Sequence, residues 1–259
     1  MLALIAGGGR LAGLVAEAAR PGLVARVHGA KSEGLEPTEV FRLEKLGAFL
    51  ALLKSRGVTQ VCFAGGVERP VIEPSAIGVR TLPFVPRMMA AMREGDDAAL
   101  RVLLAIFEEA GFAVRAAHDL APGLLPTAGV LAGALLDAAE ADGARAEAVI
   151  AALGAVDVGQ GCVVRRGQVL AVEAKFGTAW MLESLARRPD GRGGLLMKAP
   201  KPTQDRRVDL PAIGPDTVAQ ATAAGLDGIV VKAGGVMLLT PDETTRAAQE
   251  AGLFLWVRP

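Results

Sequence analysis

The chain has 259 residues, of which 51% are hydrophobic and 22% charged, a composition that excludes an intrinsically disordered protein. Lysine and arginine together number 28, as do aspartate and glutamate, so the balance gives no basic surface for nucleic acid. No apolar run approaches the roughly 18 residues of a membrane span. The first residues also lack the basic flank of a signal peptide. We therefore expect a cytoplasmic protein with no transmembrane segment.

Short apolar runs alternate with helical patterns through the first half of the chain. The runs predict strands at 2–6, 23–27, 60–64 and 113–115, and the patterns between them predict helices at 10–19, 43–56 and 98–110. Strands that alternate with helices pair in parallel through right-handed crossovers. The strands are continuously apolar, as a sheet covered on both faces requires. Residues 1–125 are thus predicted to form a Rossmann-like parallel-sheet domain.

A segment rich in proline and glycine, 119–129, marks the predicted domain boundary. Residues 126–259 are predicted to form a smaller α/β domain, so the fold class is α/β in both halves. We expect helices up to residue 153 and at 181–188, 215–224 and 242–251. Strands are expected in a hairpin at 160–164 and 169–173, and at 194–198, 229–232, 236–239 and 254–257.

The chain has two cysteines, Cys62 and Cys162, and both lie in apolar stretches. Two buried thiols in a reducing compartment are expected rather than a disulfide bond. The only histidines, His28 and His118, are too few for a histidine-rich metal site.

A glycine-rich loop follows the first predicted strand and matches the pattern G-x-G-x-x-A. Glycine lets the backbone approach a diphosphate, and the N-terminus of the next helix offers amide donors to the anion. Binding of a nucleotide phosphate is therefore predicted for Gly7, Gly8, Gly9 and Arg10, against the alternative of a turn that only packs strand on helix. The second strand ends near His28 without the acidic residue that would bind the ribose of a nicotinamide dinucleotide.

A second glycine turn follows the strand at 60–64 and contains Gly65, Gly66 and Arg69. Ligands of open parallel sheets bind beyond the carboxyl ends of the strands, so the two glycine turns are expected to converge. Arg69 is predicted to bind a phosphate or carboxylate, or else to form a surface ion pair. Asp96 and Asp97 precede a predicted helix, where one of them would act as N-cap or both would orient substrate or metal.

The segment Lys198–Gly214 combines two lysines, two arginines and two aspartates with three prolines after Lys198. Asp205 and Asp209 could share a divalent cation, which prefers carboxylate oxygen. The lysines and arginines could neutralise a phosphate, arginine through its planar fork. The alternative is a solvated loop with internal salt bridges.

On these residues the chain resembles the UDP-2,3-diacylglucosamine pyrophosphatase family of lipid A biosynthesis, the family without a metallophosphatase fold. The resemblance runs nearly end to end. Its motifs are IAGGG at 5–9, GGVERP at 65–70, GDDAAL at 95–100, and above all the segment 198–214 with its QDRRVDLP core at 204–211.

The resemblance implies a magnesium-dependent hydrolase that splits UDP-2,3-diacylglucosamine into UMP and 2,3-diacylglucosamine 1-phosphate (lipid X). It also implies a site between two domains, a homodimer, and transient contact with the inner-membrane surface. The catalytic residues would be Asp205, Asp209, Lys198 and Arg206, with Asp205 and Asp209 as Mg²⁺ ligands. Substrate binding would involve the glycine turns, Arg10, Arg69, Asp96, Asp97, Gly177, Thr178 and Gln204.

The chain departs from the family pattern at three positions. The family carries Glu-Gly-Thr-Asp where this chain has Phe176-Gly177-Thr178-Ala179, and Lys232 stands where an acid is expected. An alternative is therefore a catalytically weakened protein that binds a nucleotide sugar or lipid precursor. A dinucleotide-dependent reductase is a third possibility, which the missing ribose-binding acid disfavours. The two acyl chains need an apolar groove, from Phe84, Met88, Met89 and Met92 or from the alanine-rich helices.

Overall fold

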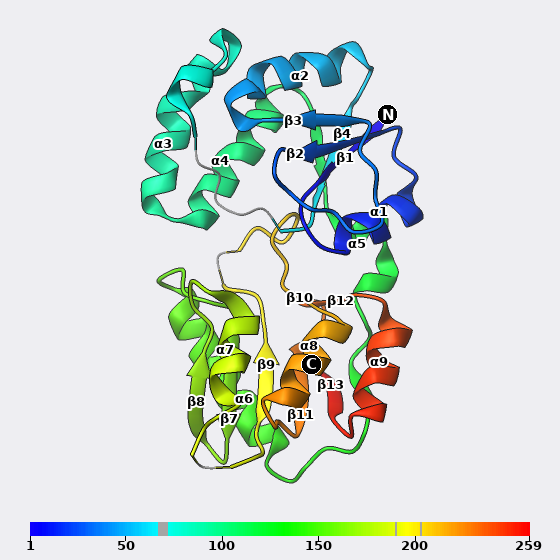
Figure 1. The fold of residues 1–259 in the computed structure, drawn as a ribbon, viewed down its shortest axis with the longest axis vertical. Helices are drawn as coiled ribbons and strands as arrows, with labels where there is room; N and C mark the ends of the chain where they lie inside the picture. Colours follow the sequence, from blue (N-terminus) through cyan, green and yellow to red (C-terminus); the bar gives the residue numbers. More distant parts are fainter. Residues whose placement is uncertain (67–71, 190, 203) are drawn as a thin grey trace. The chain divides into compact units, whose positions relative to one another are not determined.

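The computed structural model describes residues 1–66, 72–189, 191–202 and 204–259 (Figure 1). The chain divides into two compact units, Met1–Pro122 and Gly123–Pro259. The division falls close to the predicted boundary after residue 125. The second unit, which we expected to be the smaller, is the longer of the two. Among the described residues, none of the helices combines the length and the apolar character needed for a bilayer crossing.

The first unit contains a parallel sheet with the strand order β3-β2-β1-β4-β5. The order reverses between β1 and β4, which is where open sheets of this kind bind ligands. Four of the five strands were predicted, and the short edge strand β3 was not. The strands are β1 (Leu2–Ala6), β2 (Leu23–Val27), β3 (Glu39–Phe41), β4 (Gln60–Ala64) and β5 (Ala113–Arg115).

Helices cover both faces of this sheet. Phe49 and Phe107, from α2 and α4, pack with Ile5 and Val61 of the central strands, and Phe49 stacks on Phe41 with ring centroids 3.8 Å apart. The α-helices are α1 (Leu11–Ala19), α2 (Leu46–Ser55), α3 (Val85–Glu94), α4 (Asp96–Glu109) and α5 (Ala117–Leu120). The 3-10 helices are η1 (Leu43–Lys45), η2 (Pro74–Ala76), η3 (Val79–Phe84) and, at the division, η4 (Pro122–Leu124).

One capping prediction in this unit is wrong. Gly95 (φ 145°), rather than Asp96 or Asp97, is the N-cap of α4, and no side-chain capping bond is made. The left-handed region is open to glycine at little cost, so the chain turns sharply from α3 into α4 there. Both aspartates lie in the first turn of α4, where the helix dipole favours negative charge.

The second unit contains a mixed sheet with the order β6-β13-β11-β9-β7-β8. Strands β9, β11 and β13 are parallel, while β6 and the predicted β7–β8 hairpin pair antiparallel. Strand β6 was not predicted because it begins at the last residue of the segment rich in proline and glycine and continues into a stretch expected to be helical. The strands are β6 (Gly129–Ala132), β7 (Gly161–Arg165), β8 (Gln168–Val172), β9 (Leu195–Lys198), β11 (Gly228–Lys232) and β13 (Phe254–Arg258).

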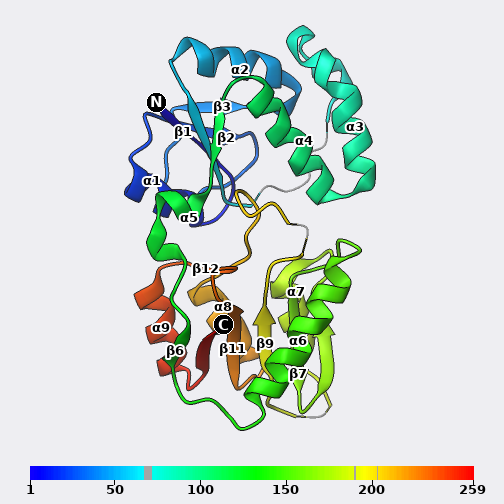
Figure 2. The same cartoon turned by 180° about the vertical axis from the view of Figure 1, so that it is seen from behind.

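This sheet is the middle layer of three (Figure 2). Helix α6 covers one face through Ala146 and Ile150, while α7, α8 and α9 cover the other, where Leu182 and Val218 are buried. Successive side chains of β9 point to opposite faces of the sheet, so Leu196 packs in the core on one face and Met197 in the core on the other. The helices are α6 (Ala139–Gly154), α7 (Gly177–Leu185), α8 (Pro215–Ala223) and α9 (Pro241–Glu250).

A two-stranded parallel sheet, β10 (Ala212–Ile213) and β12 (Met237–Leu238), lies beyond the carboxyl end of β11. It fixes the end of the segment 199–214, which leaves the carboxyl end of β9. The turn after β11 packs against the start of the same segment, since a Cβ on Gly235 would lie 2.8 Å from Pro200 Cδ. The segment is therefore attached to the carboxyl edge of the large sheet at both of its ends.

Candidate active site

Asp205 is held by its own neighbour in the segment 199–214. The guanidinium of Arg207 binds both carboxylate oxygens, with Nε–Oδ1 and Nη2–Oδ2 distances of 3.0 and 2.7 Å, and the Arg207 amide also donates to Oδ1. Bidentate pairs of this kind fix the carboxylate in orientation as well as in position. Asp205 is thus a well-oriented carboxylate at the carboxyl edge of the sheet.

Asp209 lies on the same turn as Asp205. The amides of Val208 and Asp209 both donate to the Asp205 carbonyl, at 3.2 and 3.1 Å. The Asp209 carboxylate accepts a 2.6 Å hydrogen bond from the side-chain amide of Gln204. The structure therefore brings together the two aspartates that the sequence singled out.

Gln204 is buried beneath this turn. Its Nε2 also donates to Gln160 at 3.1 Å, and its Oε1 accepts from the Lys201 amide at 2.9 Å. Its amide is thus engaged on both sides by protein groups. Arg206 is exposed on the same turn, and its Nη2 donates to the Gly234 carbonyl on the turn after β11.

Lys198 ends β9 as a buried ammonium, 4% exposed. Its Nζ donates to Glu173 Oε2 and to Thr178 Oγ1, both at 2.7 Å, and the Thr178 hydroxyl donates to the same Glu173 oxygen at 2.9 Å. Two of the predicted site residues, Lys198 and Thr178, therefore meet in one cluster. The third member, Glu173, was not predicted.

Two glycines make room for Glu173. A Cβ on Gly161 would lie 2.5 Å from Glu173 Oε2, and one on Gly159 would lie 1.9 Å from the Glu173 carbonyl oxygen. The sequence did carry a signal for this residue. A lysine at the end of a buried strand needs a buried acid as partner, and Glu173 ends the neighbouring hairpin.

The Phe176–Ala179 stretch lies at the N-terminus of α7. The helix begins at Gly177 (φ 78°), four residues before the predicted start. Phe176 and Trp180 are 67% and 57% exposed, and their ring centroids lie 5.4 Å apart. An exposed aromatic pair thus flanks Thr178, at the edge where the family pattern described above predicts two acids.

The two glycine turns of the first unit meet, as predicted. Gly8 and Gly66 form an antiparallel bridge, with each amide donating to the other carbonyl at 2.6 and 3.0 Å. The Gly7 and Gly9 amides donate to the carbonyls of Ala64 and Lys31. These amides are thus used within the protein, and the amides of the first turn of α1 are the ones oriented to receive an anion.

Apart from the glycines, the residues of the first unit that were predicted to bind substrate are Arg10, Arg69, Asp96 and Asp97. Arg10 pairs with Glu33, Nε–Oε2 3.1 Å. Asp97 is nearly buried and Asp96 is exposed. Arg69 lies outside the described residues.

The two cysteines are buried free thiols, as predicted. Burial raises the pKa of Cys62 to about 12 and that of Cys162 to about 11. Neither thiol is therefore a nucleophile near neutral pH.

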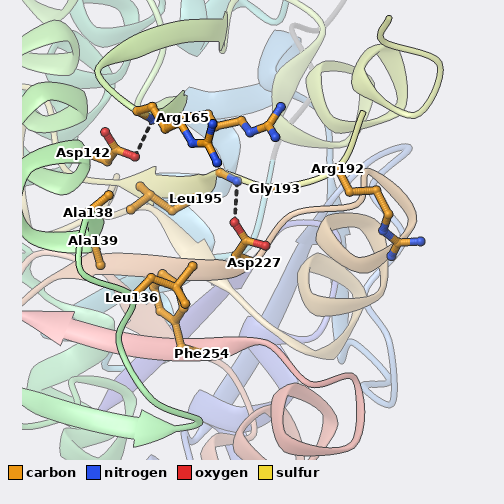
Figure 3. Close-up of a pocket in the computed structure, with 12 residues that line it drawn as sticks. Leu136, Ala138, Ala139, Asp142, Arg165, Arg192, Gly193, Leu195, Asp227 and Phe254 are labelled. Atoms are coloured by element: carbon orange, nitrogen blue, oxygen red, sulfur yellow. Dashed lines mark hydrogen bonds between the residues drawn. The ribbon is translucent and has the colours of Figure 1, made fainter. Parts of the chain in front are cut away.

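A separate small cavity of about 250 Å³ lies at the other end of the large sheet of the second unit, beside the starts of β9 and β13 (Figure 3). Asp142 and Asp227 line it, but their carboxylates already accept from the amides of Arg166 and Gly194 at 2.8 and 2.7 Å. Arg192 points away from both aspartates (Figure 3). The cavity is distinct from the segment 199–214, and its acids stabilise loops.

Comparison with known proteins assigns the chain to a family. The model of the LpxI N-terminal domain matches residues 1–124, and that of the LpxI C-terminal domain matches residues 127–256. The chain belongs to the LpxI family. It is 39% identical over 269 aligned positions to the UDP-2,3-diacylglucosamine pyrophosphatase LpxI of Caulobacter vibrioides, covering 98% of this chain and 96% of the relative. The family resemblance based on the sequence motifs is thereby confirmed.

Proposed function

We propose that this LpxI family member hydrolyses the diphosphate bond of UDP-2,3-diacylglucosamine, releasing UMP and 2,3-diacylglucosamine 1-phosphate. The observation that carries the proposal is the 39% identity to a pyrophosphatase of that name over 98% of the chain. The oriented carboxylates Asp205 and Asp209 support it, since diphosphate cleavage needs charged groups fixed in position.

We propose Asp205 and Asp209 as the magnesium ligands. Within the residues that the structure describes, no group of three or more histidine, cysteine, aspartate or glutamate side chains could hold a metal. Two carboxylates on one turn nevertheless fit Mg²⁺, which takes one or two carboxylates and completes its shell with water and substrate phosphate. When bound there, the ion would neutralise diphosphate charge and favour attack by water.

The chain's own groups then have distinct tasks. Arg207 orients Asp205, and Gln204 orients Asp209, so both carboxylates are preorganised before substrate binds. Arg206 is the exposed cation on the turn and is suited to a phosphate oxygen. Lys198 balances the charge of Glu173 and fixes the strand end from which the segment leaves.

The substrate's two acyl chains imply that it is delivered from a membrane. We therefore propose a cytoplasmic enzyme with transient contact at the inner-membrane surface. A homodimer follows from the family resemblance alone, and sedimentation of the purified protein would test it.

The test is UMP release from UDP-2,3-diacylglucosamine by the purified full chain with Mg²⁺, repeated with a chelator. Asp205→Ala should lose most turnover while circular dichroism stays unchanged. Asp242→Ala, an exposed aspartate on α9, is the matched control and should keep full activity. Near-normal UMP release by Asp205→Ala would overturn the assignment.

A second candidate function is a binding protein that has lost turnover, and it is favoured by Phe176 and Ala179 in place of the family acids. Calorimetric binding of UDP-2,3-diacylglucosamine without UMP release, across several divalent metals, would favour it over the hydrolase.

A further inference from the structure

The first unit contains an apolar cavity of about 610 Å³ that no step of the proposed hydrolysis uses. Cavities of 300–1,000 Å³ are the usual size for small-molecule ligands. Its lining is dominated by aliphatic and thioether side chains, among them Ile72, Ile77, Val85, Met88, Met89 and Met92.

Helix α3 supplies one wall of the cavity. Val85, Met88, Met89 and Met92 have the spacing i, i+3, i+4, i+7, which places them on one helical face. In most surface helices such a face is buried against the core. Here Ala91 is the only residue of α3 that is buried, and Met89 is 53% exposed. The apolar face of α3 therefore lines a hollow.

Helix α4 separates α3 from the parallel sheet in both views of the first unit (Figures 1 and 2). Arg87 and Glu109 fix α3 to α4 through two short bonds, Nη1–Oε2 2.7 Å and Nη2–Oε1 2.9 Å. This pair is on the exposed side of α3, so it anchors the helix without filling the cavity.

The opposite wall is fixed by Glu44. Its Oε1 accepts from the Glu73 amide at 3.2 Å, and its main-chain carbonyl accepts from the Gly78 amide at 2.8 Å. Thr81 Oγ1, also in the wall, accepts from the Gly47 amide at 3.0 Å. The polar side chains in this wall are thus bonded to protein groups. What the cavity offers a ligand is chiefly hydrocarbon.

We propose that this cavity binds one acyl chain of the lipid-linked substrate. The identity of the ligand rests on the proposed function, since the substrate carries two acyl chains. The location of the binding site rests on the cavity itself. Methionine side chains are flexible and polarisable, so a wall with three of them adapts to an unbranched chain. Binding of the chain would hold the substrate by a part remote from the diphosphate.

Binding of myristate to the full chain, measured by calorimetry below its critical micelle concentration, tests the cavity without any turnover. Met92→Glu places a charge in the apolar wall and should weaken myristate binding by about tenfold or more. Ala90→Glu places the same charge on an exposed position of the same helix and should change binding by less than about twofold. Loss of helical signal in Met92→Glu would move the test to Met89→Glu, whose side chain is already half exposed.

The steady-state kinetics of UMP release provide a second test. Met92→Glu should raise the KM for UDP-2,3-diacylglucosamine by about tenfold with kcat kept, as expected for loss of uniform binding. Hydrolysis of UDP-glucosamine, which has no acyl chains, should be unaffected. If the wild-type chain binds myristate but releases no UMP, the proposed hydrolysis fails while the cavity assignment stands.

Three outcomes would overturn the proposal. The first is equal myristate binding by the wild type, Met92→Glu and Ala90→Glu. The second is a dimer that dissociates in Met92→Glu, which would make the face a contact between copies of the chain. The third is Met92-dependent binding to phospholipid vesicles with none to monomeric myristate, which would make it a bilayer anchor.

Discussion

Glu173 and Lys198 form a buried ion pair across three neighbouring strands, with a Glu173 Oε2 to Lys198 Nζ distance of 2.7 Å. Glu173 follows β8 and Lys198 ends β9, with β7 between them. The pair keeps the carboxyl end of β9 electrically neutral at the point where the segment 199–214 begins. A charge left alone there would be costly, because burial removes its hydration.

Glu173→Gln should therefore lower the free energy of unfolding by about 3–5 kcal/mol, the usual cost of removing one partner from a buried pair. Urea denaturation followed by circular dichroism measures the change. The double variant Glu173→Gln with Lys198→Met should recover part of the loss, since it leaves no buried charge.

The exposed pair Arg87–Glu109 is the control for burial. Glu109→Gln should lower the stability far less than Glu173→Gln, because solvent screens a surface pair. A loss in Glu173→Gln no larger than that in Glu109→Gln would contradict the buried ion pair.

The sequence predicted the parts of the fold that continuous apolar runs and glycine turns determine. Gly8 and Gly66 meet because β1 and β4 are adjacent parallel strands whose carboxyl ends share an edge. Helix α3 was missed because a proline lies in its first turn and charged residues alternate in the sequence with the apolar residues of its face. The β7–β8 hairpin was predicted, but Glu173 lies next to Lys198 because β9 pairs with β7, and local patterns do not encode that long-range pairing.

The candidate site was predicted in part. Asp205 and Asp209 meet because a turn links residues four apart, which is a local effect. That Arg207 would bind Asp205, and that Gln204 would be buried beneath Asp209, depends on side-chain packing that the sequence alone did not reveal. How the two halves of the site meet, and whether they share Mg²⁺, stay predictions.

Arg207→Gln tests whether the orientation of Asp205 matters for turnover. Losing the bidentate pair should reduce kcat on the order of 10–100-fold, the usual effect of removing a group that positions a ligand. Stability should change by about 1 kcal/mol or less, since Arg207 is 41% exposed. UMP release and urea denaturation measure the two effects. In a chain that already carries Asp205→Asn, adding Arg207→Gln should reduce kcat no further. Unchanged kcat in Arg207→Gln would show that the ion pair only shapes the loop.

Gly7→Ala tests the close packing of the two glycine turns. An added Cβ would lie 2.5 Å from the Gly65 carbonyl oxygen, so the backbone would have to shift, and we expect a loss of about 1–3 kcal/mol in stability. Gly66→Ala is the control, because a Cβ there has no neighbour within 4 Å. The midpoint of thermal unfolding should be clearly lower for Gly7→Ala than for Gly66→Ala. Equal midpoints for the two variants would mean that the turns are loosely packed.

Glu44→Gln should change the pH dependence of stability. The hydrogen bonds from Arg42 lower the pKa of Glu44 from 4.5 to about 2 in the folded state. A lowered pKa contributes stability above the unfolded-state value, and this contribution is lost as the pH falls from about 4.5 towards about 2. At pH 7 the variant should be less stable by about 2 kcal/mol, which is less than the full pKa shift would give, because Arg42 is 42% exposed and solvent screens the pair. At pH 2 the difference should nearly vanish. Denaturation of both proteins across this range measures the difference, and a gap that persists at pH 2 would point to lost packing instead.

Introducing the acids that the family resemblance predicts at positions 176 and 179 tests whether this chain has weakened turnover. Phe176 is 67% exposed and Ala179 lies in the first turn of α7, so Phe176→Glu and Ala179→Asp should fold normally. Negative charge also suits a helix N-terminus. If acids at these positions assist hydrolysis, the double variant should release UMP at least about tenfold faster than the wild type. A general acid or base usually contributes that much or more. Phe176→Gln with Ala179→Asn is the matched neutral control and should show no gain. An equal rate in the wild type and both variants would mean that Asp205 and Asp209 suffice without further acids at this edge.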